Sequence, residues 1–94
     1  MSERIKRRRA IKCADMYLAE LPNPKLIHNA DERQQASYAR SAILYLRKLF
    51  DEDPSRTPRQ NTLLFIDAMN RKTSKRYSIA YDTAVDFFDK YFTL

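Results

Sequence analysis

The sequence contains no glycine, and it has only one cysteine, Cys13, and one histidine, His28. Without glycine the chain lacks the residue that mirror-image hairpin turns, phosphate-cradling loops and dinucleotide-binding turns require, because these need positive φ or close backbone approach. A single cysteine excludes an internal disulfide, and together with a single histidine it argues against a thiolate–imidazole metal site. We therefore expect no metal and no cofactor.

Long hydrophobic runs are also missing from the chain. No window approaches the roughly 20 apolar residues that a membrane-spanning helix needs. The basic N-terminus leads into Cys13, Asp15 and Glu20 rather than into an apolar segment with a cleavage site, so no signal peptide is indicated. The 94 residues form one small domain, 1–94, which we expect to be cytoplasmic.

The residues present do not indicate a catalytic site. The chain has no glycine-flanked nucleophile and no HExxH pair, and its serines and threonines lie where helix caps are needed. Asp51, Glu52 and Asp53 precede Pro54, and we interpret them as a solvated helix end rather than as a cation site. The protein is therefore predicted to act by binding and not by reaction.

The spacing of apolar residues predicts an all-α protein. In the stretch 36–50, Ala36, Ala39, Ile43, Leu46 and Phe50 follow one another by three or four residues, which places them on one helix face. Ala42, Tyr45 and Leu49 widen this stripe, so the apolar arc needs at least two neighbouring helices to cover it. Short connections favour a compact antiparallel bundle, with four helices at about 3–21, 30–51, 58–70 and 74–92.

Capping residues mark the helix starts. Asn29 followed by Glu32, and Thr57 followed by Gln60, both have the spacing of a capping box. Thr73 or Ser74 is expected to cap the fourth helix. Between the first two helices, prolines at 22 and 24 predict a stop and a short turn, which we expect to bring Leu26 and Ile27 onto the core.

The inner faces of the last two helices are also predicted from spacing. The third helix is expected to bury Leu64, Phe65, Ala68 and Met69. The fourth is expected to bury Tyr77, Tyr81, Ala84, Phe88 and Tyr91 or Phe92, and Ile79, Ala80, Val85 and Phe87 are expected to broaden this apolar face. Phe87 and Phe92 extend beyond the central stripe, and their excess apolar surface would be buried if two chains formed a homodimer.

The net charge is +6, and it is concentrated in two segments. The N-terminal cluster consists of Arg4, Lys6, Arg7, Arg8, Arg9 and Lys12. The inter-helix cluster consists of Arg71, Lys72, Thr73, Ser74, Lys75 and Arg76. Both clusters favour anionic partners, namely nucleic acid, an acidic protein or an anionic membrane face.

Charges at two helix ends oppose the helix dipole. Cations in the first turn of the helix at 3–21 each cost roughly a few tenths of a kcal/mol, so this end should fray unless something negative lies against it. The carboxylates of Asp51, Glu52 and Asp53 likewise oppose the dipole of the second helix, because they lie at its C-terminal end.

A short third helix, a polar turn and a longer fourth helix have the outline of a helix-turn-helix. In that arrangement Ser74, Lys75, Arg76 and Ser78 would approach DNA. The turn has no glycine, however, and three outer aspartates of the fourth helix would repel DNA: Asp82, Asp86 and Asp89. The polar turn and alanine–aromatic helix at 70–92 resemble the C-terminal part of small phage regulators related to sigma-factor DNA-binding domains, which implies DNA binding.

Three functions remain open. The first is a non-enzymatic nucleic-acid-binding protein of phage or plasmid accessory type, a regulatory protein binding duplex DNA through the residues of both clusters. The second is a protein-binding bundle. In size, charge and architecture the chain is similar to the bacteriocin immunity proteins of lactic acid bacteria, which implies a membrane receptor or toxin complex as partner. The third is a homodimerisation module.

The position of the two basic clusters in the folded chain separates these hypotheses. One contiguous face containing both clusters favours DNA, because both can then follow a phosphate backbone. Clusters on opposite sides, with acidic surface between them, favour protein or membrane contact and argue against DNA.

Overall fold

The computed structural model describes residues 3–92, and the side chains of residues 6–92. It contains four α-helices, α1 (Glu3–Glu20), α2 (Ala30–Glu52), α3 (Pro58–Asn70) and α4 (Lys75–Tyr91), with a 3₁₀ turn, η1 (Pro24–Leu26), between the first two. Residues 3–92 contain no strand. The predicted all-α bundle is therefore confirmed, and every predicted helix end lies within one residue of the observed one.

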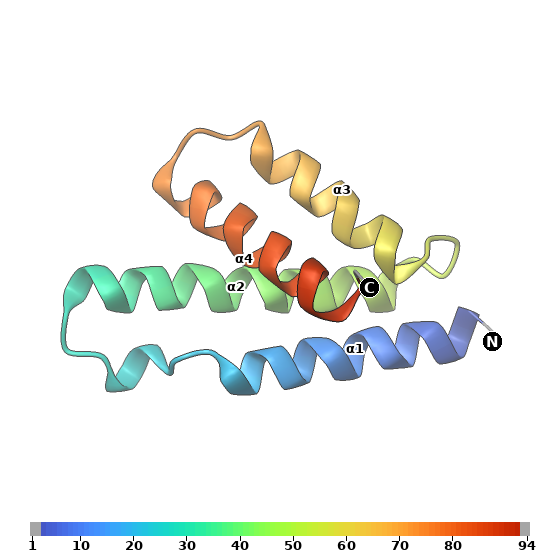
Figure 1. Cartoon of the computed structure of the whole chain (residues 1–94), viewed down its shortest axis with the longest axis horizontal. Helices are drawn as coiled ribbons and strands as arrows, with labels where there is room; N and C mark the ends of the chain where they lie inside the picture. Colours follow the sequence, from blue (N-terminus) through green and yellow to red (C-terminus); the bar gives the residue numbers. More distant parts are fainter. Residues whose placement is uncertain (1–2, 93–94) are drawn as a thin grey trace.

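The helix α2 is the centre of the arrangement (Figure 1). The helix α1 runs antiparallel along one side of α2, and α4 packs against α2 on another side. The helix α3 lies beside α4 and runs in the opposite direction, and it contacts α2 much less than α1 and α4 do. The helix α3 therefore diverges from α2, while α4 packs against both.

Helix caps explain where the chain turns. The Asn29 side chain accepts a hydrogen bond from the backbone N–H of Glu32, as expected for an N-cap. At α3, Thr57 Oγ1 accepts from the N–H of Gln60 at 3.1 Å, and Gln60 Oε1 accepts from the N–H of Thr57 at 2.9 Å. The predicted capping box at Thr57 is thus confirmed. Ser74 occupies the N-cap position of α4 but makes no capping bond with its side chain.

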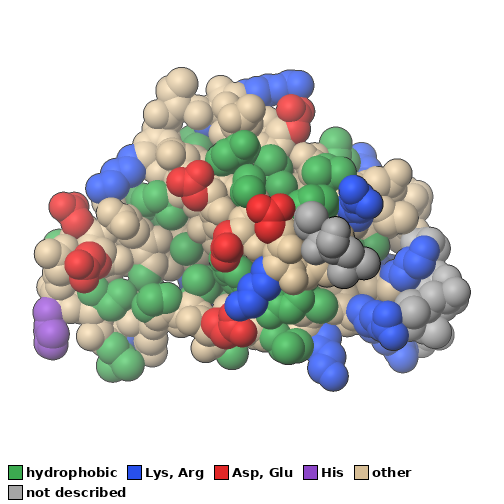
Figure 2. Space-filling view, viewed as in Figure 1, with side chains coloured by type: hydrophobic (Ala, Val, Ile, Leu, Met, Phe, Trp, Pro, Cys, Tyr) green, Lys and Arg blue, Asp and Glu red, His purple; other side chains and the backbone are tan. Residues whose placement is uncertain are grey.

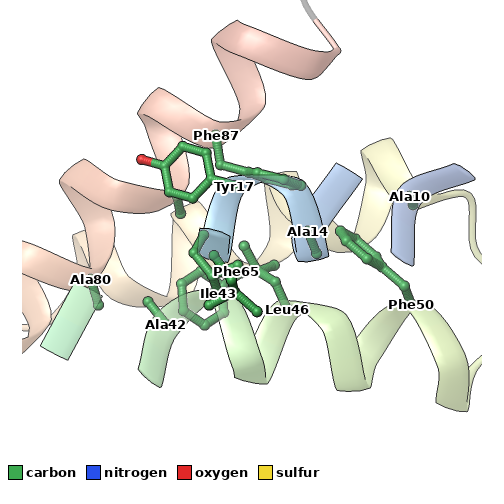
Figure 3. Packing of buried hydrophobic residues seen from close by; sticks show 12 residues of the cluster. Ala10, Ala14, Tyr17, Ala42, Ile43, Leu46, Phe50, Phe65, Ala80 and Phe87 are labelled. Atoms are coloured by element: carbon green, nitrogen blue, oxygen red, sulfur yellow. The ribbon is translucent and has the colours of Figure 1, made fainter. Parts of the chain in front are cut away.

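The core is built around large side chains of α2 and one aromatic ring of α4 (Figure 3). Ile43, Leu46, Phe50 and Phe87 are fully buried. The Phe87 ring packs edge-on against Tyr17 of α1, with centroids 5.4 Å apart, and stacks with Phe50 at 6.1 Å. Alanines at the helix contacts let the backbones approach closely: Ala10, Ala14, Ala42, Ala80 and Ala84.

The centre of the inner face of α4 differs from the predicted one. Its buried residues are Ala80, Thr83, Ala84 and Phe87, so Ala84 of the predicted stripe is buried together with two residues, Ala80 and Phe87, that were expected only to broaden it. Tyr91 and Phe92 are half-buried against the core. Almost every turn of α4 carries apolar side chains, so spacing alone is compatible with two adjacent buried faces. In the structure, the buried face is the one that places small residues against α2. Phe87 is buried inside a single chain, which removes it from the argument for a dimer.

On the inner face of α3, the prediction holds for Phe65 and in part for Met69, which is half-buried against the core, but not for Leu64 and Ala68. The buried residues are Pro58, Asn61, Thr62 and Phe65, while Leu64 remains 48% exposed. Burial of Asn61 and Thr62 is possible because both side chains donate hydrogen bonds, Asn61 Nδ2 to the Leu49 carbonyl at 3.3 Å and Thr62 Oγ1 to the Pro58 carbonyl at 2.9 Å.

Two further predictions on the apolar residues differ from the structure. Leu26 is 77% exposed and does not reach the core, whereas Ile27 is half-buried. On α3, Ala68 is exposed and Met69 is half-buried against the core. The leucine and alanine that α3 leaves in solvent, Leu64 and Ala68, lie on its side toward α2.

Replacing Phe87 tests the observed core. We expect Phe87→Ala to lower the free energy of unfolding by about 3–5 kcal/mol, because a fully buried ring is replaced by a cavity. Phe88→Ala is the matched control, since Phe88 is only half-buried and should cost clearly less. Urea denaturation measures both. Equal losses, or a larger loss for Phe88, would contradict the core described here.

A second test concerns the hydroxyl of Tyr17, which donates to Asp86 Oδ2 at 2.6 Å. Burial first, and then this hydrogen bond, raise the pKa of Tyr17 above its usual value of 10.0. In alkaline solution the unfolded chain therefore releases this proton before the folded chain does. The contribution of this pKa shift to the free energy of unfolding is complete below pH 10.0, and it is lost as the pH rises through the pKa of Tyr17 in the folded chain.

We expect Tyr17→Phe to flatten the fall of the unfolding free energy above pH 10.0. The slope should not vanish, because the pKa values of Tyr91 and Lys90 are also raised, Tyr91 mainly by burial and Lys90 mainly by its hydrogen bond to Glu20. Denaturation at several alkaline pH values measures the slope. A variant with the wild-type slope would show that Tyr17 does not contribute to it.

Candidate binding surfaces

The N-terminal cluster lies on the first half of α1. Lys6, Arg8, Arg9 and Lys12 are exposed, and Arg7 is half-buried and donates from Nη1 to the Asp51 carbonyl oxygen at 3.4 Å. The side chain of Arg4 lies outside the described part of the chain. Figure 2 shows Lys and Arg gathered at this end of the molecule. Among the described residues, Arg8, Arg9 and Lys12 form no ion pair.

The cations of the inter-helix cluster each contact a local partner. Arg71 pairs with Asp67 on α3, with Nη2 and Oδ2 3.0 Å apart. Lys75 lies 4.0 Å from Asp31 at the start of α2. Lys72 and Arg76 lie over aromatic rings, the first over Tyr77 at 5.5 Å and the second over Tyr38 at 5.9 Å. The positive charge of this cluster is therefore partly compensated within the fold.

The structure places the two clusters at opposite ends of α2. Arg7 contacts Asp51 near the last residue of α2, whereas Lys75 pairs with Asp31 near the first. Twenty residues of α-helix separate these aspartates by about 30 Å, at 1.5 Å a residue. Acidic side chains occupy the middle of the face in Figure 2. The helix α4 exposes Asp82, Asp86 and Asp89. On the face in Figure 2, acidic side chains therefore interrupt the positive charge.

The helices α3 and α4 run side by side in opposite directions (Figure 1). A helix-turn-helix instead sets its two helices at about 90–120° to each other. Ser74, Lys75, Arg76 and Ser78 are exposed, and the Arg76 guanidinium lies over the Tyr38 ring of α2 at 5.9 Å. This packing gives no support to the insertion of α4 into a DNA groove.

An apolar groove of about 350 Å³ opens between α2, α3 and the first half of α4. It exists because α3 packs on α4 and diverges from α2. Its floor includes Ala42, Phe65 and Ala80, all part of the core in Figure 3. The walls carry the remaining lining residues: Tyr38, Ser41, Tyr45, Leu49, Leu64, Ala68, Met69, Arg76 and Tyr77.

The groove exposes apolar surface that a folded chain would normally cover. Tyr45 is 54% exposed although its ring lies 5.7 Å from that of Phe65, and Leu64 is 48% exposed. The only charged residue of the lining is Arg76. Tyr38 and Tyr77, which lie at the margins of their helical stripes, are half-buried at its edges. The groove therefore offers a mainly apolar surface with a cation at one end.

Sequence reasoning missed this groove because it assigned Leu64 and Ala68 to the core. A signal was present in the third helix, where Leu63, Leu64, Phe65 and Ile66 are consecutive. Four adjacent apolar residues surround a helix, and one neighbouring helix cannot cover all of them. In the structure α4 covers one side, and Leu63 and Leu64 remain exposed at 45% and 48%.

A second hollow of about 600 Å³ lies at the end of the N-terminal cluster. Lys6 and Arg9 of α1 and Arg59 of α3 line it together with the rings of Tyr91 and Phe92. Cys13 also lines it, is half-buried and packs against the core, and its pKa is raised mainly by burial. This hollow combines cations from two helices with aromatic surface.

The described residues give no indication of other kinds of site. Within residues 3–92, no three side chains of His, Cys, Asp or Glu are grouped so that they could hold a metal ion. None of the helices in that range is both long enough and apolar enough to cross a membrane.

Comparison with protein-family models, with curated proteins and with solved structures finds no match to this chain.

Proposed function

We propose that this chain is a non-enzymatic protein-binding helical bundle whose contact surface is the groove between α2, α3 and α4. The observation that carries the proposal is the exposure of Tyr45 and Leu64 on an apolar groove that no segment among residues 3–92 fills. Contiguous exposed apolar surface of this kind marks interaction sites in soluble proteins. The groove is also the form in which helical domains accept a partner helix.

The distribution of charge supports a protein partner over duplex DNA. A duplex that contacted both clusters over the face in Figure 2 would meet acidic side chains, and the outer face of α4 exposes Asp82 and Asp89. The inter-helix cations are partly compensated by Asp67, Asp31 and two tyrosine rings. Of the alternatives derived from the sequence, the protein-binding bundle therefore fits the folded chain best.

Two adjacent leucines allow a matched test of this function. Leu64 lines the groove and Leu63 does not, although the two are exposed to nearly the same extent. We expect Leu64→Glu to abolish capture of a partner by the immobilised chain from a lysate of cells that encode it, because the carboxylate would be desolvated in the interface. Leu63→Glu should retain the same protein.

Quantitative mass spectrometry of the captured proteins measures the difference between the two variants. Circular dichroism checks that both variants keep the wild-type helix content. A protein captured equally by Leu64→Glu and Leu63→Glu, or a complete lack of capture, would contradict the proposed function. Sedimentation of the free chain shows whether a second copy is the partner, in which case only Leu64→Glu should change the mass.

The N-terminal cluster favours a second candidate, nucleic-acid binding through α1 alone. Arg8, Arg9 and Lys12 form no ion pair within the described residues, and the positive end of the α1 dipole adds to their potential. Arg59 extends this surface across the neighbouring hollow. Such an arrangement suits the phosphate backbone and carries no base specificity, as in a phage or plasmid accessory protein that binds duplex DNA.

A mobility-shift titration with duplex DNA tests this candidate. If α1 neutralises about four phosphates, the logarithm of the association constant should fall with the logarithm of salt concentration at a slope near −3.6. Replacing Arg8, Arg9 and Lys12 by glutamate should abolish the shift. Replacing Arg71 and Lys75 by glutamate, at the other end of the chain, should leave it. No shift at low salt, or an unchanged shift in the first variant, would exclude the candidate.

A further inference from the structure

We infer that the groove accepts an amphipathic α-helix whose polar side is acidic. This inference depends on the proposed function and names the chemistry of its partner. It follows from the shape of the groove, the side chains that line it and the charge at one end.

The shape of the groove fits a helix. The helices α2 and α3 form its walls, and the small side chain of Ala80 on α4 lies between them at the floor. A helix placed there would present side chains at positions i, i+3 or i+4, and i+7 to the floor. Leu49 and Met69 offer aliphatic and flexible contacts, and Met adapts well to varied partners.

The aromatic side chains of the lining would order such a helix. Tyr45 of α2 and Tyr77 of α4 both line the groove, and their rings supply large contact surfaces at low cost in side-chain entropy. The Tyr45 ring is already held against Phe65, so little reorganisation is needed on binding. The groove is therefore largely formed before a partner arrives.

The charge of the groove selects the polar side of the partner. Arg76 is the only charged residue of the lining, and its guanidinium is placed over the Tyr38 ring. It forms no ion pair within the described residues. A guanidinium over a ring can still donate its N–H groups to a carboxylate, which it binds through two parallel hydrogen bonds. Lys72, over the neighbouring Tyr77, strengthens the positive potential at this end.

The chain's own acidic helix does not meet this description. The outer aspartates of α4 belong to a helix whose apolar side is already buried against α2 and α3. A second copy would have to unfold α4 to insert it. A partner protein with a free amphipathic helix needs no such rearrangement.

Three synthetic peptides of about 16 residues, or about 24 Å of helix, test the inference. The first has a leucine stripe and a glutamate polar side, the second has the same stripe with lysine, and the third is the first in scrambled order. Each is titrated into the isotopically labelled full chain and followed by NMR. We expect the first peptide to shift the amide signals of Tyr45, Leu64 and Tyr77, and to bind about tenfold or more tightly than the second.

The scrambled acidic peptide controls for attraction to the N-terminal cluster. It should leave the groove signals unchanged, and any shifts it causes should lie on α1. The variant Arg76→Glu should reverse the preference between the first two peptides. Arg71→Glu is the matched control, since it makes the same change of charge on a residue outside the groove lining and should keep the preference.

The inference is overturned if the two amphipathic peptides bind equally, if the groove signals do not shift, or if Arg76→Glu has no effect on the preference. It is also overturned if dilution of the free chain alone shifts the groove signals, because a second copy would then be the occupant. Stronger binding of the lysine peptide in the groove would refute the acidic partner and leave the proposed function intact. Failure of the proposed function itself appears separately, in the capture experiment with Leu64→Glu.

Discussion

The structure depends on the need to cover the wide apolar face of α2. Ile43, Leu46 and Phe50 are fully buried, and only helices on two sides of α2 can achieve this. The helices α1 and α4 supply that cover, and Phe87 joins them by contacting Tyr17 and Phe50. Once α2 is covered in this way, α3 packs mainly on α4. The groove is thus the consequence of a core that α1, α2 and α4 dominate and to which α3 adds Phe65.

Antiparallel packing also explains the charges that oppose the dipole of their own helix. The cations at the start of α1 and the carboxylates at the end of α2 each oppose the dipole of their own helix. Packing α1 antiparallel to α2 brings these two ends together, and Arg7 donates to the carbonyl oxygen of Asp51 there. Each end then lies in the favourable field of the other. The arrangement of charges therefore favours this pairing of helices.

Sequence reasoning located the helices well because caps and prolines act locally. The capping box of Thr57 and Gln60 has the same geometry in any fold, so spacing alone identifies it. The direction in which a helix faces is different, because it is decided by its neighbours. On α4 two apolar lines were available, and the close approach to α2 selected the one with Ala80 and Ala84.

The candidate site was harder to predict for the same reason. Both basic clusters were recognised in the sequence, but their separation depends on α2 lying between them. The groove was not recognised, because the spacing of Leu64 predicts a core residue. Its exposure follows from the divergence of α3 from α2, which the sequence does not show. Arg76 was assigned to DNA contact from its position in a polar turn. Its place over Tyr38 is a tertiary contact that no local pattern contains.

The distance between the two ends of the molecule bears on how they act together. Charges in water are screened over about 8–10 Å at physiological ionic strength, and the clusters lie about 30 Å apart along α2. The potential at Arg76 therefore depends little on the charges of α1, and the reverse also holds. The groove and the cationic end can be occupied at the same time without competing. A helix bound in the groove would leave α1 exposed, so two anionic partners of different kinds fit one small bundle.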